Sequence, residues 1–155
     1  MARQRTLISL ILVFLATFLM SCGGPAISTP PPTYTQAQVQ KINEYKTDIV
    51  TVRERAAELG QLIGKKEWIK VGNFIHGPMA EARLDMTYII PNLLPNDQPA
   101  ARKIARDLFD HLVKIDQAAT SGNQVVAASN FAAAYSDFDK FLQLLPESSS
   151  SAEEG

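Results

Sequence analysis

Residues 68–95 carry a helical pattern of apolar side chains that a Gly-Pro pair interrupts. Side chains of this kind recur every three or four residues on both sides of the interruption: Trp68, Val71, Phe74, Ile75, Met79, Ala82, Met86, Ile89, Ile90 and Leu93. This spacing places them on one face of a helix. Because proline has no amide hydrogen and disfavours helical geometry in the residue before it, Gly77-Pro78 predicts a kink or a brief break in a long core helix.

His76 stands directly before this break, and two interpretations of it are open. In the first, the break shapes a ligand or metal site with His76 as its polar group. In the second, the break is a tolerated kink, and the imidazole caps backbone carbonyls that the proline leaves free. Since single motifs over-predict function, the second interpretation is favoured.

The first predicted helix begins near Thr35. Thr35 and Gln38 have the spacing of a capping box at the start of an apolar stripe. The stripe comprises Val39, Ile42, Tyr45, Ile49, Val52, Ala56, Leu59, Leu62 and Ile63. Gly64, followed by Lys65 and Lys66, predicts the C-cap. We therefore predict one continuous helix, about 40 Å long at 1.5 Å per residue.

Two further helices follow residue 95. Asn96 or Asp97 can cap the third helix, with Pro99 tolerated in its first turn. Its stripe is Ala101, Ile104, Ala105, Leu108, Leu112, Ile115 and Ala119. The Ser-Gly-Asn sequence at 121–123 predicts the end of this helix and the start of the fourth. The fourth stripe is Val126, Phe131, Ala134, Tyr135, Phe138, Phe141, Leu142 and Leu145, and Pro146 ends it.

These stripes predict an all-α protein. Four long amphipathic helices with short connections run antiparallel to their neighbours in sequence, which gives an up-down-up-down four-helix bundle over residues 36–146. With 155 residues and 46% hydrophobic content, the chain has room for one ordinary domain. Residues 147–155 are polar and acidic and are predicted to be disordered.

The N-terminal region predicts export and lipid attachment. Arg3 and Arg5 precede an apolar run that is shorter than the roughly 20 residues of a membrane span, so residues 1–21 are interpreted as a signal peptide. The sequence Leu-Met-Ser-Cys at 19–22 resembles a bacterial lipobox. Cys22 is the only cysteine and lies where a lipoprotein needs it, which favours lipidation over an ordinary signal with a chance cysteine.

Residues 22–35 are interpreted as a flexible, proline-rich tether. The segment is rich in Pro, Gly, Ser and Thr, and three consecutive prolines at 30–32 favour an extended conformation. At about 3.1 Å per residue it could span about 40 Å. The bundle is therefore predicted to be anchored to a membrane surface at Cys22 and not embedded in it.

The sequence offers little for catalysis or nucleic-acid binding. Removing residues 1–21 leaves thirteen basic against sixteen acidic side chains, without a basic stripe. The mature chain has two imidazoles, His76 and His111, and no nucleophile motif. Glu-x-x-His pairs for di-iron and Cys-x-x-Cys-His for haem are both absent. We predict no enzyme, no catalytic or cofactor-binding residues and no cofactor.

A metal site and a basic surface are the weaker candidates. Asp107 and His111 are spaced i, i+4 with Asp110 beside them, so a surface zinc ion could find two ligands there. Because closed zinc sites use four ligands, we predict no physiological metal site. The candidates for a basic docking face are Lys65, Lys66, Lys70, Arg83, Arg102, Lys103 and Arg106.

Several motifs in this order also resemble a known family. They are Trp68, Asn-Phe-Ile-His-Gly-Pro-Met at 73–79, Arg83, Leu-Leu-Pro-Asn-Asp at 93–97, the set Leu112, Ile115, Asp116, Ala118 and Ala119, and the set Tyr135, Asp137, Phe138, Asp139, Phe141, Leu142, Leu144, Leu145 and Pro146. Over residues 36–146 they resemble the PsbQ family, the Q-type extrinsic subunits of photosystem II. The lipobox and the proline-rich tether fit its cyanobacterial branch.

This resemblance implies a four-helix lipoprotein on the lumenal side of the thylakoid membrane. It would bind the photosystem II core and other extrinsic subunits, near the manganese-stabilising protein and a chlorophyll-binding antenna subunit. Its role would be non-catalytic, in stabilising the oxygen-evolving complex and helping it to retain calcium and chloride. The alternative is a lipid-anchored helical carrier that binds a small ligand or metal near Gly77-Pro78.

Overall fold

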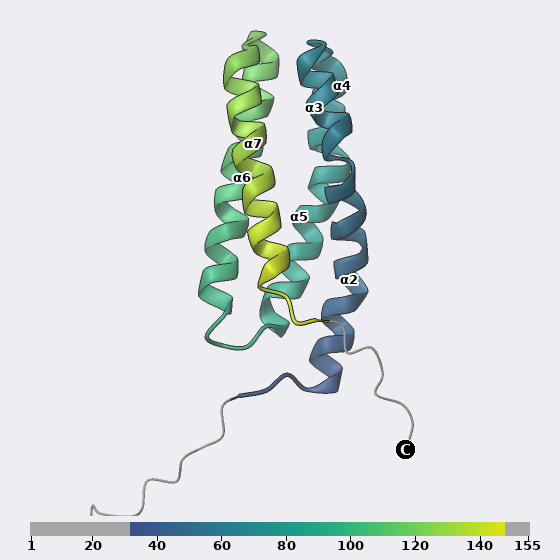
Figure 1. Cartoon of the computed structure of the whole chain (residues 1–155), viewed down its shortest axis with the longest axis vertical. Helices are drawn as coiled ribbons and strands as arrows, with labels where there is room; N and C mark the ends of the chain where they lie inside the picture. The colour runs from purple at the N-terminus through teal and green to yellow at the C-terminus, as the bar shows by residue number, and fades with distance from the viewer. Residues whose placement is uncertain (1–31, 148–155) are drawn as a thin grey trace, which may run out of the picture. The chain divides into compact units, whose positions relative to one another are not determined.

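The computed structural model of the protein describes residues 32–147, which contain helices and no β-strand. The elements are α2 (Gln36–Glu54), α3 (Ala56–Gly64), α4 (Trp68–His76), α5 (Pro78–Ile89), the 3-10 turn η1 (Ile90–Asn92), α6 (Gln98–Ser121) and α7 (Gln124–Gln143). They form four antiparallel rods, the first made of α2 and α3 and the second of α4 and α5 (Figure 1). The prediction of an all-α, up-down-up-down four-helix bundle is confirmed. The predicted signal peptide, Cys22, most of the tether and most of the tail lie outside the described residues.

A side-chain cap starts the first rod but not the third. Thr35 accepts a hydrogen bond from the Gln38 amide, and the Gln38 side chain accepts one from the Thr35 amide at 2.9 Å, so the predicted capping box is present. Asp97 occupies the N-cap position of α6, but its side chain makes no capping bond. Its carboxylate instead accepts a hydrogen bond from the Tyr34 hydroxyl at 3.4 Å, which fastens the entering chain to the α5–α6 connection.

The first rod is not continuous, so the prediction of a single long helix was wrong there. Arg55 lies between α2 and α3 with φ −80° and ψ 10°. Its amide donates to the Val52 carbonyl, three residues back, at 3.2 Å. This is the bond of a 3-10 helix, so the helix is locally tighter at this position. Neither proline nor glycine marks this position in the sequence.

The core runs the length of the bundle. Its largest fully buried side chains are Phe138, Phe141, Ile42, Ile49, Leu59, Met79, Met86, Ile89, Leu93, Leu108, Ile115 and Val71. α6 packs most extensively on α7, and α2 on α5. Small buried side chains permit the close approach of α6 and α7: Ala101, Ala105, Ala118, Ala119, Ala127 and Ala134. Val126, predicted for the stripe of α7, is 40% exposed, and Ala127 faces the core in its place.

The first and second rods each end in a way that differs from a simple helix. In the first rod, Gly64 is the last residue of α3 and not its cap, because the left-handed conformation that stops the helix falls on Lys66. In the second rod, α5 tightens into η1 at Pro91, before the chain turns toward α6. In the described part of the chain, no helix combines the length and the apolar character that crossing a membrane requires.

Candidate docking surface

The predicted break at Gly77-Pro78 has a steric cause in the structure. α4 ends at His76 and α5 begins at Pro78, where the missing amide hydrogen is not needed. The Gly77 amide donates to the Asn73 carbonyl at 2.9 Å. A Cβ atom on Gly77 would lie only 2.9 Å from that same carbonyl oxygen. The close approach of backbone to backbone therefore requires glycine at this position.

Replacing Gly77 with alanine should lower the free energy of unfolding by about 1–3 kcal/mol, because the added methyl group must displace helix backbone. Chemical denaturation measures the change. Gly64→Ala is the matched control, since a Cβ at Gly64 meets nothing within 4 Å. That control should be neutral or stabilising by up to about 1 kcal/mol. Equal effects at the two positions would contradict the steric explanation.

The favoured prediction that His76 caps backbone carbonyls was wrong. Its side chain is exposed, and Nε2 lies 3.1 Å from the Asp116 carboxylate on α6. Because a carboxylate oxygen only accepts, Nε2 carries the proton in this contact. The imidazole thus links the α4–α5 junction to the third rod.

The cavity beside His76 is small. It has a volume of about 170 Å³ and is lined mainly by apolar side chains of α4, α5 and α6. At its edge the Arg83 guanidinium lies over the Phe109 ring, 5.1 Å from the ring centroid. Ligand pockets usually enclose about 300–1,000 Å³. The cavity therefore gives no support to a carrier function.

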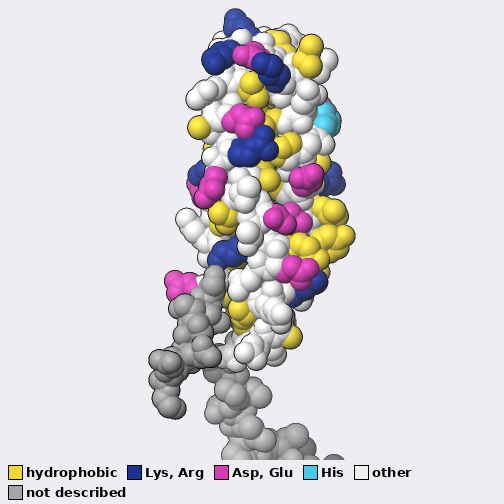
Figure 2. Space-filling view, turned by 90° about the vertical axis from the view of Figure 1, so that its right-hand side faces the viewer, with side chains coloured by type: hydrophobic (Ala, Val, Ile, Leu, Met, Phe, Trp, Pro, Cys, Tyr) yellow, Lys and Arg dark blue, Asp and Glu magenta, His cyan; other side chains and the backbone are white. Residues whose placement is uncertain are grey.

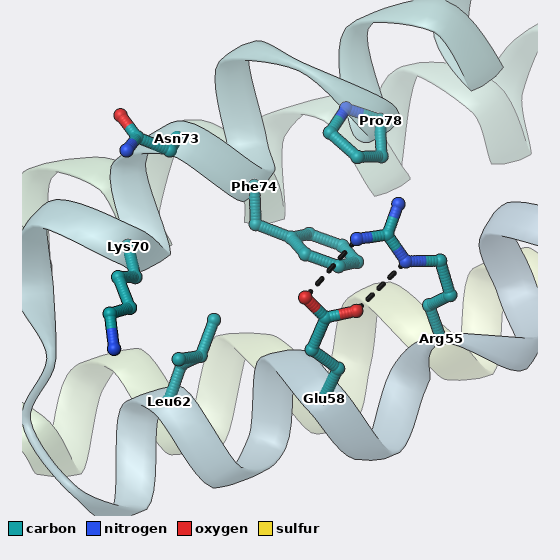
Figure 3. A pocket seen from close by; sticks show the side chains of 7 residues that line it. All are labelled: Arg55, Glu58, Leu62, Lys70, Asn73, Phe74 and Pro78. Atoms are coloured by element: carbon teal, nitrogen blue, oxygen red, sulfur yellow. Dashed lines mark hydrogen bonds and ion pairs between the residues drawn. The ribbon is translucent and has the colours of Figure 1, made fainter.

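A second depression lies on the other side of the break, between α3 and α4 (Figure 3). Its volume is about 250 Å³, again below the usual range for a ligand. Arg55 lies over the Phe74 ring at 4.9 Å and forms two hydrogen bonds with Glu58, at 2.8 and 3.1 Å. These bonds raise the pKa of Arg55 and lower the pKa of Glu58. The charges at this depression are therefore paired within the bundle.

The candidate zinc ligands Asp107 and His111 each bond to another side chain. The Asp107 carboxylate accepts a hydrogen bond from Lys103 at 2.5 Å, which lowers its pKa. His111 faces α7, where Nδ1 lies 2.9 Å from the Asn130 side-chain oxygen and Nε2 lies 3.7 Å from Asp137. Within residues 32–147, no group of three or more potential ligands is placed to hold a metal ion.

Asp137 belongs to a polar cluster that sequence reasoning missed. It is the buried charged residue of the described chain, and its carboxylate accepts a hydrogen bond from Lys140 at 2.8 Å. The His111 imidazole from α6 and the Lys140 ammonium group both face this carboxylate. The signal was present in the sequence, because an aspartate directly precedes Phe138 on the apolar stripe of α7.

A second polar cluster joins the first rod to the fourth. Arg53 donates two hydrogen bonds to the Asp139 carboxylate, at 2.6 and 2.8 Å, and these hold the pKa of Asp139 below its ordinary value. The same guanidinium lies over the Tyr135 ring at 5.2 Å. Burial raises the pKa of Tyr135 to about 12. The Tyr-x-Asp-Phe-Asp motif therefore consists of residues that pack the bundle and join its rods.

The candidate basic residues form separate groups instead of one face. Lys65, Lys66 and Lys70 lie at the α3–α4 turn, where basic side chains gather at the upper end of the face in Figure 2. Arg102 and Lys103 lie on the first half of α6, near the opposite end, and bond to Gln98 and Asp107 respectively. The lysines at the α3–α4 turn are thus the ones concentrated at one end of the bundle.

The chain is similar to known proteins over almost its whole length. The family model for PsbQ, described as oxygen evolving enhancer protein 3, matches residues 2–146. The chain belongs to the PsbQ family. A PsbQ relative, CyanoQ of Synechocystis sp. (strain ATCC 27184 / PCC 6803 / Kazusa), is 37% identical over 150 residues, which cover 96% of this chain and 100% of that protein.

Proposed function

We propose that the protein is a non-catalytic extrinsic subunit of photosystem II, held on the lumenal side of the thylakoid membrane. The observation that carries this proposal is the PsbQ match over residues 2–146. It is supported by a bundle whose core is filled with side chains and by the small volumes, about 250 and 170 Å³, of the two depressions beside the Gly77-Pro78 break. Such a protein acts by binding to a neighbour.

The finer role that we propose is to stabilise the oxygen-evolving complex and to support its retention of calcium and chloride. A rigid bundle can do this without binding either ion, by covering the complex and slowing the escape of ions into solution. The partners would be the photosystem II core and the other extrinsic subunits.

We further propose that lipidated Cys22 holds the bundle at the membrane, with residues 23–35 as the tether. Anchoring raises the local concentration of the bundle at its partner, so a modest contact area can suffice. Acyl chains contribute about 0.8 kcal/mol per buried methylene, and two or more chains give stable attachment.

The proposed role is tested in a strain that lacks the gene. Oxygen evolution in this strain should fall below that of the parent when calcium or chloride is limiting, and it should recover when both ions are supplied in excess. Reintroducing the wild-type gene should restore the parental rate. Equal rates in the deletion and parent strains under limiting ions would overturn the proposed role in ion retention.

A further inference from the structure

The α3–α4 turn holds a lysine in a backbone conformation that favours glycine. At the end of α3, the Glu67 amide donates to the Leu62 carbonyl at 2.9 Å, and the Lys66 amide donates to the Ile63 carbonyl at 3.1 Å. These two bonds define a Schellman motif, in which the left-handed residue is usually glycine. Here that residue is Lys66, with φ 57°, and no other non-glycine residue of the described chain has a positive φ.

The α6–α7 turn at the same end of the bundle contains the same motif with glycine in it (Figure 1). The Asn123 amide donates to the Ala118 carbonyl at 2.8 Å, and the Gly122 amide donates to the Ala119 carbonyl at 3.2 Å. Gly122 has φ 69°. Because a side chain in this region costs backbone free energy, Lys66 carries a cost that the equivalent Gly122 avoids. An observed backbone strain of this kind points toward a functional constraint.

The two turns are in contact and form one end of the described bundle. The Gln124 side chain on α7 donates to the Gly64 carbonyl at 2.9 Å. The Trp68 indole nitrogen lies 3.7 Å from the position that a Cβ of Gly122 would occupy. Two aliphatic side chains next to these contacts are left in solvent, Ile69 at 83% and Val125 at 79% exposure.

This end is basic although the whole chain has a net charge of −1. Three lysines at the α3–α4 turn stand against one glutamate, and residues 118–126 of the other turn add no charged side chain. Lys70 pairs with Glu67. Lys65 and Lys66 have no carboxylate within 4.0 Å among the described residues. We call Lys65, Lys66, Lys70, Ile69 and Val125 the basic end.

We propose that the basic end is the surface through which the bundle docks on an acidic protein surface. Carboxylates of the partner would face Lys65 and Lys66, and Ile69 and Val125 would supply the apolar contact. The chain carries a net negative charge but the bundle has one positive end, so a negatively charged partner attracts that end first. The charges therefore determine the orientation in which the bundle approaches its partner as well as its affinity. This inference rests on the proposed function, because it names the part of the bundle that meets photosystem II.

A protein surface fits the basic end better than a lipid surface does. Anionic lipids are recognised by clusters of about four to eight basic side chains. The basic end has two lysines without a carboxylate partner and two separate aliphatic side chains, which are too few for that mode. A protein partner can use the same groups because it also supplies shaped apolar contacts.

Lys66 allows a test that separates docking from folding. Lys66→Gly and Lys66→Asn both remove the charge and suit the left-handed backbone, so each should raise the melting temperature, Lys66→Gly by about 2–4 °C. Each should nevertheless weaken rebinding of the full mature protein to photosystem II isolated from a deletion strain, by about threefold to fivefold at low salt. Lys66→Arg keeps the charge and should bind like the wild type. Arg106→Gln removes a charge from the first half of α6 and should also leave binding unchanged.

The possible outcomes are distinct. Failure of the wild-type protein to rebind would contradict the proposed function itself. Normal wild-type binding together with unchanged binding of Lys66→Gly and Lys66→Asn would overturn the docking role of the basic end alone. Weakened binding of Lys66→Arg to the same extent would show that charge is not the cause and would also overturn it. Vesicles that contain phosphatidylglycerol should bind the Lys66 variants and the wild type equally, and variant-sensitive binding to vesicles alone would assign the basic end to the membrane.

Discussion

Replacing Phe138 with alanine is expected to lower the free energy of unfolding by about 3–5 kcal/mol. The Phe138 side chain is fully buried, and its ring stacks on Tyr135 with the two ring centroids 5.9 Å apart. Alanine would leave a cavity between α7 and the other rods that a close-packed core cannot fill by relaxing. Because domains of this size are stable by only about 5–15 kcal/mol, the variant should unfold at a much lower urea concentration.

Val125→Ala is the control for this substitution. Val125 lies on the same helix but is 79% exposed, so its truncation should change the free energy of unfolding by no more than about 0.5 kcal/mol. An effect of less than about 1 kcal/mol for Phe138→Ala would contradict the packing of α7 described above.

Replacing Cys22 with serine should release the protein from membranes almost completely. The variant cannot carry the proposed acyl chains, whose burial contributes about 0.8 kcal/mol per methylene. The effect is best measured in a strain without photosystem II, where docking cannot retain the protein. There the wild type should sediment with the membranes, and Cys22→Ser should appear in the soluble lumenal fraction.

Ser21→Ala is the matched control for the anchor, because it keeps a small residue directly before the cysteine of the lipobox. It should remain on the membranes like the wild type. If Cys22→Ser stayed on membranes that lack photosystem II, lipid attachment at this cysteine would be contradicted. Mass spectrometry of the mature N-terminus would show directly whether Cys22 carries acyl chains.

Features of the fold that depend on neighbouring residues could be predicted from the sequence. The side chains of Thr35 and Gln38 each accept a hydrogen bond from the backbone amide of the other residue, and the two residues are only three positions apart. The capping box was therefore visible in the sequence. Gly122 and Asn123 end one helix and start the next through bonds within a few residues. The Gly77-Pro78 break likewise follows from covalent chemistry. Each of these predictions needed no knowledge of the tertiary fold.

Features that depend on contacts between rods were missed. The break at Arg55 accompanies the contact of its guanidinium with Phe74 on another rod, and no residue in the sequence signals it. The C-cap of α3 was missed for a local reason: glycine is the usual left-handed residue, so Gly64 was the predicted cap, whereas the chain places Lys66 in that conformation.

The polar clusters show the same limit. Spacing within one helix paired Asp107 with His111, but the partners of His111 lie on α7, at Asn130 and Asp137. Periodicity indicates which face of a helix is apolar and does not indicate which side chains meet across two helices. Without that information, a polar contact between rods could be mistaken for a candidate metal site.

The most direct test of the central proposal is to isolate the affinity-tagged protein from gently solubilised thylakoid membranes and to quantify the proteins that accompany it by mass spectrometry. We expect photosystem II core subunits and the other extrinsic subunits in amounts close to that of the tagged protein. Recovery of the tagged protein without photosystem II subunits, from membranes in which that complex is intact, would contradict the proposal.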